Sequence, residues 1–439
     1  MVKNISSKFI INGGNPLHGS HFSPGNKNAA LPMIAAALMA DGVVELTNLP
    51  IIRDVQVMLT LAEELGAKVN LDCVARKVVI DPTTLKTDTL PQELCSKIRT
   101  SILFAGALIS RSERVVISPP GGDVIGLRRL DTHFDGFKRL GMEIPENIPF
   151  EFRRKGRLHG AKILLDEASV TATENLVMAA VKAEGHTVLF NTACEPHVVN
   201  LCNMLNGMGA RITGVGTNRL EIDGVERLHG GSFRIMPDYI ESASFIAAAA
   251  ATRGSIKIEN TEEEDFLVLQ RPFSRLGVQW TRDENGVLTF DSSQCELRIS
   301  NDVSGAIAKI DDGIWPAVPS DLLSVLIVLA TQVDGIVLFF EKMFESRLYF
   351  IDNLIGMGAH IVQCDPHRIV VHGSGKNSLK STHMLSPDIR AGMALVLAGL
   401  CAKGTTYIGN AESIDRGYES LEKSLSDLGA DIKREIISE

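Results

Sequence analysis

The chain has 439 residues, of which 45% are hydrophobic, and its net charge is −9. This length exceeds what one small core requires, so we expect two or more domains. The absence of a basic block argues against a nucleic-acid surface, and the apolar runs are too short to span a bilayer.

The seven cysteines are odd in number and include no CxxC pair, which indicates neither a disulfide framework nor a zinc site. The first residues lack the apolar core of a signal peptide. We therefore expect a globular protein of the reducing cytosol.

A phrase recurs six times along the chain: a helical stretch ends at Leu-Gly or Met-Gly, and a strand follows after a small or apolar residue. Its glycines are Gly66, Gly141, Gly209, Gly277, Gly358 and Gly429. Glycine readily adopts the left-handed conformation that ends many helices. The repeat therefore predicts six α/β units.

Six units are compatible with one ring, a solenoid or two domains of three units. The length favours two domains, but the spacing alone does not decide. Segments 29–39 and 244–251 are apolar nearly all round, which predicts buried helices. The Gly-Met-Gly motif at 207–209 follows a helix and precedes a strand, the wrong order for a dinucleotide fingerprint, and no Walker loop is present.

Segment 118–128 has the composition of a mobile active-site lid. Two prolines end a strand-like run, two glycines follow, and the loop carries Asp123 before it reaches Arg128. Loops that move over a site often hold functional residues. A solvated surface loop is the alternative interpretation.

Five basic side chains lie in loop contexts that suggest anion binding. They are Lys27, Arg128, Arg347, Arg390 and Arg416. Lys27 stands where an apolar helix begins, and the free N–H groups at such a position favour an anion. Each of the five is also explained as a surface cation, with Asp388/Arg390 and Asp415/Arg416 as surface pairs.

Asp321 begins a strongly apolar helix after Pro319 and Ser320. An acid in the first turn suits the helix dipole, so helix capping is the simplest interpretation. From the residues alone, the chain is a two-domain α/β protein with several candidate anion sites, or equally a repeat-built binding scaffold.

Eight phrases, taken in chain order, resemble the UDP-N-acetylglucosamine 1-carboxyvinyltransferase family of enolpyruvyl transferases. They lie at 25–32, 120–128, 169–175, 237–238, 319–321, 344–347, 388–390 and 414–419. The match covers essentially the whole chain, which makes it specific. The shikimate-pathway enolpyruvyl transferase shares the fold, but its lysine phrase is rich in serine, unlike the one here.

The resemblance implies two inside-out α/β barrel domains, each built from three βαβαββ-type units. One domain would join residues 1–26 to 237–439, and the other would be 27–236 with the lid at 118–128. We expect a cytoplasmic monomer or weak homo-oligomer with small-molecule substrates and no nucleic-acid or membrane partner. No metal or organic cofactor is implied.

The implied reaction transfers the enolpyruvyl group of phosphoenolpyruvate to the 3-hydroxyl of UDP-N-acetylglucosamine and releases phosphate. It is the first committed step of peptidoglycan synthesis, on which cell-wall biogenesis, cell shape and cell division depend. Phosphoenolpyruvate carries several negative charges, so it requires clustered cations.

The family pattern assigns roles to individual residues. Lys27, Arg128 and Arg416 would hold the phosphate, while Arg347 and Arg390 would hold the carboxylate. Asp321 would accept the proton of the attacking sugar hydroxyl, and Asp123 would protonate the methylene carbon. Asn28 would contact both substrates. The positions that match the UDP-sugar site are Asn28, Arg99, Arg128, Arg129, Leu130, Asp131, Thr132, Glu167, Ala168, Ser169, Val170, Asp321 and Met343.

Three positions depart from the family pattern. Most members have Cys at position 123, which fosfomycin alkylates, so Asp123 predicts insensitivity to fosfomycin. The family more often has arginine at Tyr239, and lysine is common at Glu167. A sister enzyme with another UDP-sugar acceptor is therefore an alternative, and a catalytically silent paralogue that binds a sugar nucleotide is another.

Overall fold

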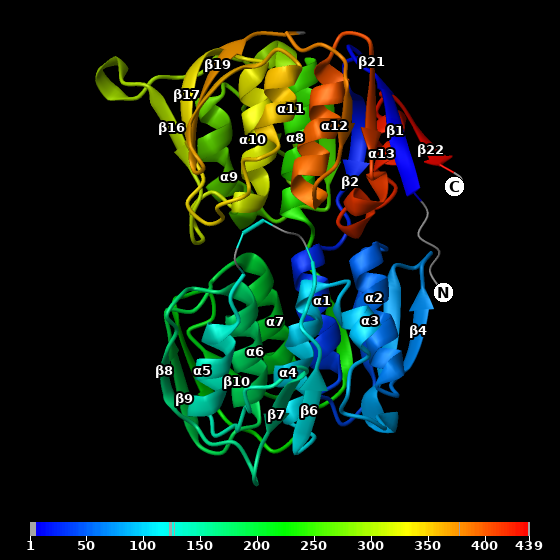
Figure 1. The fold of residues 1–439 in the computed structure, drawn as a ribbon, viewed down its shortest axis with the longest axis vertical. Helices are drawn as coiled ribbons and strands as arrows, with labels where there is room; N and C mark the ends of the chain where they lie inside the picture. Colours follow the sequence, from blue (N-terminus) through cyan, green and yellow to red (C-terminus); the bar gives the residue numbers. More distant parts are fainter. Residues whose placement is uncertain (1–5, 123–124, 127, 377, 438–439) are drawn as a thin grey trace. The chain divides into compact units, whose positions relative to one another are not determined.

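The computed structural model describes residues 6–122, 125–126, 128–376 and 378–437. The chain divides into two compact units, each a mixture of helices and strands (Figure 1). Unit 1 comprises Met1–Ser23, Val124–Leu127 and Pro237–Glu439, and unit 2 comprises Pro24–Asp123 and Arg128–Met236.

The helices and strands of unit 2 alternate along the chain. In order they are α1 Lys27–Ala37, β3 Val44–Thr47, α2 Arg53–Glu64, β4 Lys68–Asp72, β5 Lys77–Asp81, α3 Gln92–Cys95, α4 Leu103–Ile109, β6 Arg114–Ile117, α5 Asp131–Arg139, β7 Phe150–Arg153, β8 Lys162–Leu164, α6 Val170–Val181, β9 His186–Phe190, α7 Pro196–Gly207, β10 Arg211–Thr213, β11 Arg219–Asp223 and β12 Gly231–Arg234.

Unit 1 has the same alternation. Its elements are β1 Ser6–Asn12, β2 His18–Phe22, α8 Tyr239–Thr252, β13 Ser255–Glu259, α9 Glu263–Arg275, β14 Thr281–Arg282, β15 Leu288–Asp291, β16 Ala308–Asp311, α10 Ser320–Thr331, β17 Asp334–Phe340, α11 Ile351–Gly356, β18 His360–Asp365, β19 Arg368–Ser374, β20 His383–Leu385, α12 Ile389–Cys401, β21 Thr405–Gly409, α13 Leu421–Asp427 and β22 Asp431–Ile437.

One sheet topology recurs through both units. Unit 1 has sheets in the orders β20-β21-β1-β22, β14-β15-β13-β2 and β16-β17-β19-β18, and unit 2 has β10-β11-β9-β8 and β12-β3-β5-β4. In each of them one outer strand runs parallel to its neighbour and the remaining pairs are antiparallel. The β6-β7 pair has the same pattern, because Thr89 forms a parallel bridge to β6 and Glu143 forms an antiparallel bridge to β7. The described residues therefore contain six versions of one sheet.

The six repeat glycines end the helices as the sequence predicts. Gly66, Gly141, Gly209, Gly277, Gly358 and Gly429 have φ between +76° and +103°. Three of these glycines lie in each unit, directly after α2, α5, α7, α9, α11 and α13. The prediction of six α/β units is confirmed, and they divide three and three.

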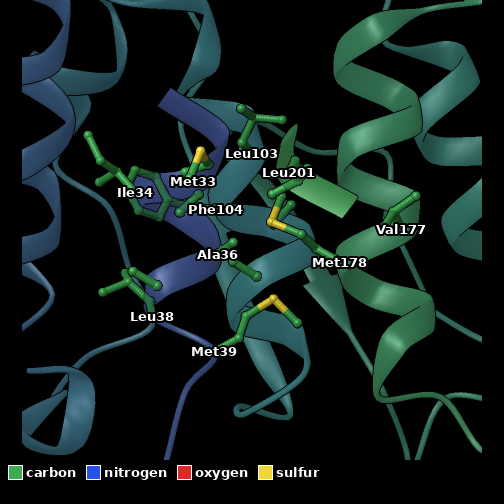
Figure 2. Packing of buried hydrophobic residues seen from close by; sticks show 14 of the residues in the cluster. Met33, Ile34, Ala36, Leu38, Met39, Leu103, Phe104, Val177, Met178 and Leu201 are labelled. Carbon is green, nitrogen blue, oxygen red and sulfur yellow. The ribbon is translucent and has the colours of Figure 1, made fainter. Parts of the chain in front are cut away.

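The apolar helices form the interior of each unit, and the strands lie outside them (Figure 1). In unit 1, α10 contacts both α8 and α12, and every residue of α8 is buried. In unit 2, α4 contacts both α1 and α6. Met33, Phe104 and Met178 from these three helices belong to one hydrophobic cluster (Figure 2). The two helices expected to be buried are confirmed, with bounds of Lys27–Ala37 and Tyr239–Thr252.

In two of the six repeats, the first strand and the helix that follows it in the chain belong to different units. Elsewhere a strand such as β8, β16 or β20 is followed by a buried helix of its own unit. However, β2 belongs to unit 1 and is followed by α1 of unit 2, while β12 of unit 2 is followed by α8 of unit 1. The chain passes from one unit to the other after Ser23 and after Met236.

Candidate active site

In unit 1, Asp321 lies in the first turn of α10 and faces two arginines. Its Oδ1 is 2.9 Å from Arg347 Nη2, and its Oδ2 is 2.9 Å from Arg390 Nη2. The two guanidinium groups are nearly buried, whereas 27% of the Asp321 side chain is exposed. Asp321 is therefore more than a helix cap, because its carboxylate binds two cations from distant segments.

Arg390 is held by the start of its own helix. Asp388 caps α12 by accepting the backbone N–H groups of Arg390 and Ala391 at 2.8 and 3.0 Å. The guanidinium of Arg390 lies over the ring of Tyr418, whose hydroxyl oxygen is 3.4 Å from Nη1. Burial raises the pKa of Tyr418, which keeps this hydroxyl protonated. The interpretation of Asp388 and Arg390 as a surface pair is wrong, because both are buried and Asp388 binds the backbone.

Arg416 and Met343 occupy the same unit as Asp321. Arg416 ends the short 3₁₀ turn Ala411–Arg416 and is half-buried, and Met343 is exposed. Asp415 binds Arg434 on β22 with an Nη1–Oδ2 distance of 2.8 Å. Asp415 therefore binds a residue of another element, which the sequence did not predict.

Tyr239 begins α8 and is buried, and its ring packs at a tilt against Trp315 with the centroids 5.7 Å apart. The preceding residue, Asp238, caps α8 through the N–H groups of Ile240 and Glu241. An aromatic ring thus occupies the position at which the family more often has a cation.

In unit 2, Lys27 and Asn28 form the first turn of α1. Asn26 caps this helix by accepting the N–H of Ala29 at 3.0 Å. The ammonium of Lys27 is 2.7 Å from Asp54 Oδ2, and both side chains are nearly buried. The helix dipole and the lysine together favour an anion here. Asp54 was not anticipated, since only the fold brings α2 next to the start of α1.

Arg99 is the second cationic centre of unit 2. Its Nη2 donates to the backbone oxygens of Arg128 and Arg129 at 2.6 and 3.0 Å. Burial and the nearby charge of Arg128 lower the pKa of Arg99 to about 10, although Glu167 opposes this shift. Arg99, Arg128 and Glu167 are therefore neighbours, as expected for parts of one site.

The remaining residues expected at the UDP-sugar site lie at the starts of α5 and α6. Leu130 and Asp131 begin α5, Arg129 pairs with Asp131 at the surface, and Thr132 donates to Asp166. Glu167 and Ala168 lead into Ser169, which caps α6 at Val170.

Buried His133 packs behind these residues. Burial, assisted by the charge of Arg99, lowers its pKa to about 3. It is therefore neutral, and its ring nitrogens lie 3.2 Å from Thr171 Oγ1 and 3.0 Å from Asn175 Nδ2.

Asp123 lies outside the described residues. Of the expected lid, Gly121 donates its N–H to Cys95 O in unit 2, and Ile125 accepts the N–H of Ser346 in unit 1. No group of His, Cys, Asp and Glu among the described residues is arranged to hold a metal ion. None of the described helices has the length and hydrophobicity needed to cross a membrane.

The sequence interpretation did not identify two buried acids of unit 1, Asp312 and Glu341. Glu341 accepts the hydroxyl of Ser320, which in turn lies 3.3 Å from Arg347 Nε. Neither acid lies in a phrase that matched the family, so their only sequence signal is an acid directly after an apolar strand.

Comparison with known proteins agrees with this arrangement. The family model for EPSP synthase (3-phosphoshikimate 1-carboxyvinyltransferase) matches residues 11–425. The chain is 49% identical to the UDP-N-acetylglucosamine 1-carboxyvinyltransferase of Treponema denticola, over 97% of this chain and 99% of the relative. It is 47% identical to the protein of that name from Borreliella burgdorferi, over 97% and 98% of the two chains.

Solved structures agree on the fold. The enolpyruvyl transferase NikO from Streptomyces tendae has a TM-score of 0.87 at 23% identity and covers 99% of this chain and 100% of its own. EPSP synthase from Acinetobacter baumannii has a TM-score of 0.74 at 18% identity, covering 98% and 100%. These results confirm the expected fold class and family. The chain therefore belongs to the UDP-N-acetylglucosamine 1-carboxyvinyltransferase family of enolpyruvyl transferases.

Proposed function

We propose that the protein transfers the enolpyruvyl group of phosphoenolpyruvate to the 3-hydroxyl of UDP-N-acetylglucosamine and releases phosphate, opening peptidoglycan synthesis. The observation that carries this proposal is the meeting of buried Arg347 and Arg390 on Asp321 at the start of α10. Relatives of 47–49% identity that span nearly the whole chain are named for this reaction.

Arg347 and Arg390 bind the carboxylate of phosphoenolpyruvate. Each presents a guanidinium edge to Asp321 in this structure, and a substrate carboxylate offers the same planar pair of oxygens. When the substrate takes over these two arginines, the oxygens of Asp321 become available to accept a proton. Lys27, Arg128 and Arg416 bind the phosphate.

The chemistry requires one base and one acid. The oxygen of the sugar 3-hydroxyl bonds to C2 of phosphoenolpyruvate while Asp321 accepts the proton of that hydroxyl. Asp123 donates a proton to C3. In the resulting ketal, Asp123 takes a proton back from C3 while phosphate leaves C2 with the proton held by Asp321, which restores the C2–C3 double bond as the enol ether of the product. Protons and charge balance without an oxidant or a metal.

The UDP-sugar binds to residues of unit 2 around Arg99, the start of α5 and the start of α6. Arg129, Leu130, Asp131 and Thr132 contribute from α5, and Glu167, Ala168, Ser169 and Val170 contribute from α6. Asn28, Asp321 and Met343 contact the sugar. Backbone N–H groups at the start of α6 favour the negative diphosphate.

A phosphate-release assay tests the proposal. The protein is mixed with phosphoenolpyruvate and, in separate reactions, UDP-N-acetylglucosamine, other UDP-sugars and shikimate 3-phosphate. We expect the fastest release with UDP-N-acetylglucosamine. Faster release with another UDP-sugar would reassign the acceptor and connect it to Tyr239 and Glu167. No release with any acceptor would refute catalysis.

The same proposal implies a cytoplasmic enzyme, because both substrates are soluble and negatively charged. We propose a monomer or a weak homo-oligomer with no nucleic-acid or membrane partner. The reaction as written needs no cofactor.

A further inference from the structure

Two fully buried carboxyl groups lie behind Asp321 in unit 1. The parallel strands β16 and β17 pair Asp311 with Phe340 at their ends, and the next residue of each strand is an acid, Asp312 or Glu341. Both side chains are at most 1% exposed. Because parallel strands end at the same edge of a sheet, the two acids meet beneath the start of α10.

The turn that follows β17 wraps around these two acids. Glu341 Oε1 accepts the N–H groups of Met343 and Phe344, both at 3.0 Å. Asp312 Oδ1 accepts the N–H of Lys342. Three consecutive backbone donors thus point at one carboxyl pair. The turn continues directly to Arg347, so its shape sets where that guanidinium lies.

The same carboxyl pair is linked to the first turn of α10. Ser320 Oγ donates to Glu341 Oε2 at 2.9 Å and lies 3.3 Å from Arg347 Nε. Ser320 precedes Asp321 in the chain, and Asp321 binds Arg347. Glu341 therefore fixes both partners of the Asp321–Arg347 pair, one through Ser320 and the other through the turn.

One oxygen requires a proton that no neighbouring donor supplies. Among the described residues, buried Asp312 Oδ2 has no hydrogen-bond partner. An unsatisfied buried oxygen is costly, and two adjacent buried carboxylates repel each other. A proton on Glu341 removes both costs. Burial, the hydrogen bond with Asp312 and the charge of Asp312 raise the pKa of Glu341 to about 8, while Arg347 and Ser320 oppose the shift.

We propose that Glu341 and Asp312 share one proton and act as positioning residues that hold Arg347 and Asp321 in the geometry needed for phosphoenolpyruvate. This inference rests on the proposed function of the site. Loss of the shared proton adds a negative charge behind Arg347, which then competes with the substrate carboxylate. Affinity for phosphoenolpyruvate should therefore fall on the alkaline side.

Three basic side chains lie near the Asp312–Glu341 pair or belong to the turn around it: Arg347, His367 and Lys342. Arg347 faces the pair through Ser320, and His367 Nδ1 lies 2.8 Å from the backbone oxygen of Glu341. The ammonium of Lys342 turns away to bind Asp311. Arg347 is the cation whose charge lowers the pKa of Glu341.

Two variants separate the hydrogen bonds of Glu341 from its ability to ionise. Glu341→Gln keeps hydrogen-bonding groups but cannot ionise, and Glu341→Ala removes both properties. Glutamine keeps the acceptor for the turn, and its amide donates to Asp312 in place of the proton. We expect the glutamine variant to remain within about threefold of the parent at pH 7. The alanine variant should raise the KM for phosphoenolpyruvate and lower kcat, together costing about 10- to 100-fold, with UDP-N-acetylglucosamine binding changed less than about twofold.

The pH profile is the deciding measurement. In the parent, the KM for phosphoenolpyruvate should rise above about pH 8. Glu341→Gln and Asp312→Asn should lack this rise, because each variant leaves the pair with one carboxylate. Exposed Glu284→Gln is the matched control and should keep the parent profile. An unchanged rise in both pair variants, or a glutamine variant as impaired as alanine at pH 7, would refute the proposal.

Amide hydrogen exchange tests the positioning role of Glu341 independently of catalysis. The N–H groups of Met343 and Phe344 should be protected in the parent and in Glu341→Gln, and should exchange at least about tenfold faster in Glu341→Ala. Equal protection in all three proteins would refute the positioning role even if the enzyme is active. Conversely, a parent protein that releases no phosphate but shows this pattern would overturn the proposed function and leave the positioning role intact.

Discussion

The proposed chemistry depends on Asp321, and a single substitution can separate its catalytic role from its structural role in the first turn of α10. Asp321→Asn keeps an oxygen for Arg347 and remains a good first-turn residue. We expect turnover to fall by about two to four orders of magnitude with UDP-sugar binding unchanged. Steady-state kinetics and calorimetric binding measure the two effects.

The matched control is Asp352→Asn, which alters an exposed acid in the first turn of α11 in the same unit. It should leave turnover unchanged. Near-normal turnover in Asp321→Asn would show that Asp321 is not the base.

Asp123 makes a second prediction at the residue scale. Fosfomycin requires a thiolate, and a carboxylate is a much weaker nucleophile toward an epoxide. The parent enzyme should keep full activity after incubation with fosfomycin, while Asp123→Cys should lose activity with time. Mass spectrometry of the intact protein checks for the adduct. Covalent labelling of the parent, or full activity in Asp123→Asn, which cannot donate the proton, would contradict the assignment.

The sequence predicted which side chains are charged at the site but not how they pair. Arg347 and Arg390 were candidate anion-binding residues, yet each alone also suited a surface position. The pairing of Lys27 with Asp54 and of Asp415 with Arg434 joins separate elements. The two partners in each of these pairs are far apart in the sequence. Local spacing carries no information about such contacts.

At the scale of elements, the repeat glycines offer a controlled comparison. Gly358 has φ +95° and no atom within 4 Å of an added Cβ, whereas Gly277 has φ +76° and would place Cβ 2.1 Å from Glu296 O. Gly358→Ala should lower the free energy of unfolding by about 1–2 kcal/mol through left-handed strain alone. Gly277→Ala adds a backbone clash and should cost about 3 kcal/mol or more.

Denaturant unfolding measures both variants, and Gly358→Ala should retain its kinetic constants. Equal losses of stability in the two variants would show that the backbone around Gly277 relaxes freely. The repeat was predictable because helix ends are encoded locally by glycine. The bounds of α1 and α8 were less predictable, since an apolar helix gives no periodic signal at its ends.

At the scale of the whole molecule, the proposed phosphoenolpyruvate residues are divided between the units. Lys27 and Arg128 belong to unit 2, while Arg347, Arg390 and Arg416 belong to unit 1. Cations drawn from both units into one site would repel one another without a bound anion, so we expect the UDP-sugar to bring the units together. Small-angle scattering should show a smaller radius of gyration, and protease should cut segment 118–128 more slowly. Equal cleavage with and without UDP-sugar would contradict this.

The number of repeats followed from their spacing, but their assignment to units followed only from the family resemblance. All six repeats share one spacing pattern, so nothing in the spacing marks where one core ends. The assignment depends on β2 and β12, each of which pairs in one unit and is followed by a helix of the other. Such strand pairing is long-range and is set by the fold.

This order of pairing has a consequence for how the protein is made. β1 pairs with β21 and β22, which are among the last described elements of the chain to be translated. At elongation rates of about 5–20 residues per second, the ribosome needs roughly 20–80 s to make the intervening chain. Unit 2 emerges complete during that interval, so we expect it to fold first, while β1 and β2 wait as unpaired strands. Unpaired strand edges invite aggregation, which makes the N-terminal segment a natural target for a chaperone at the ribosome.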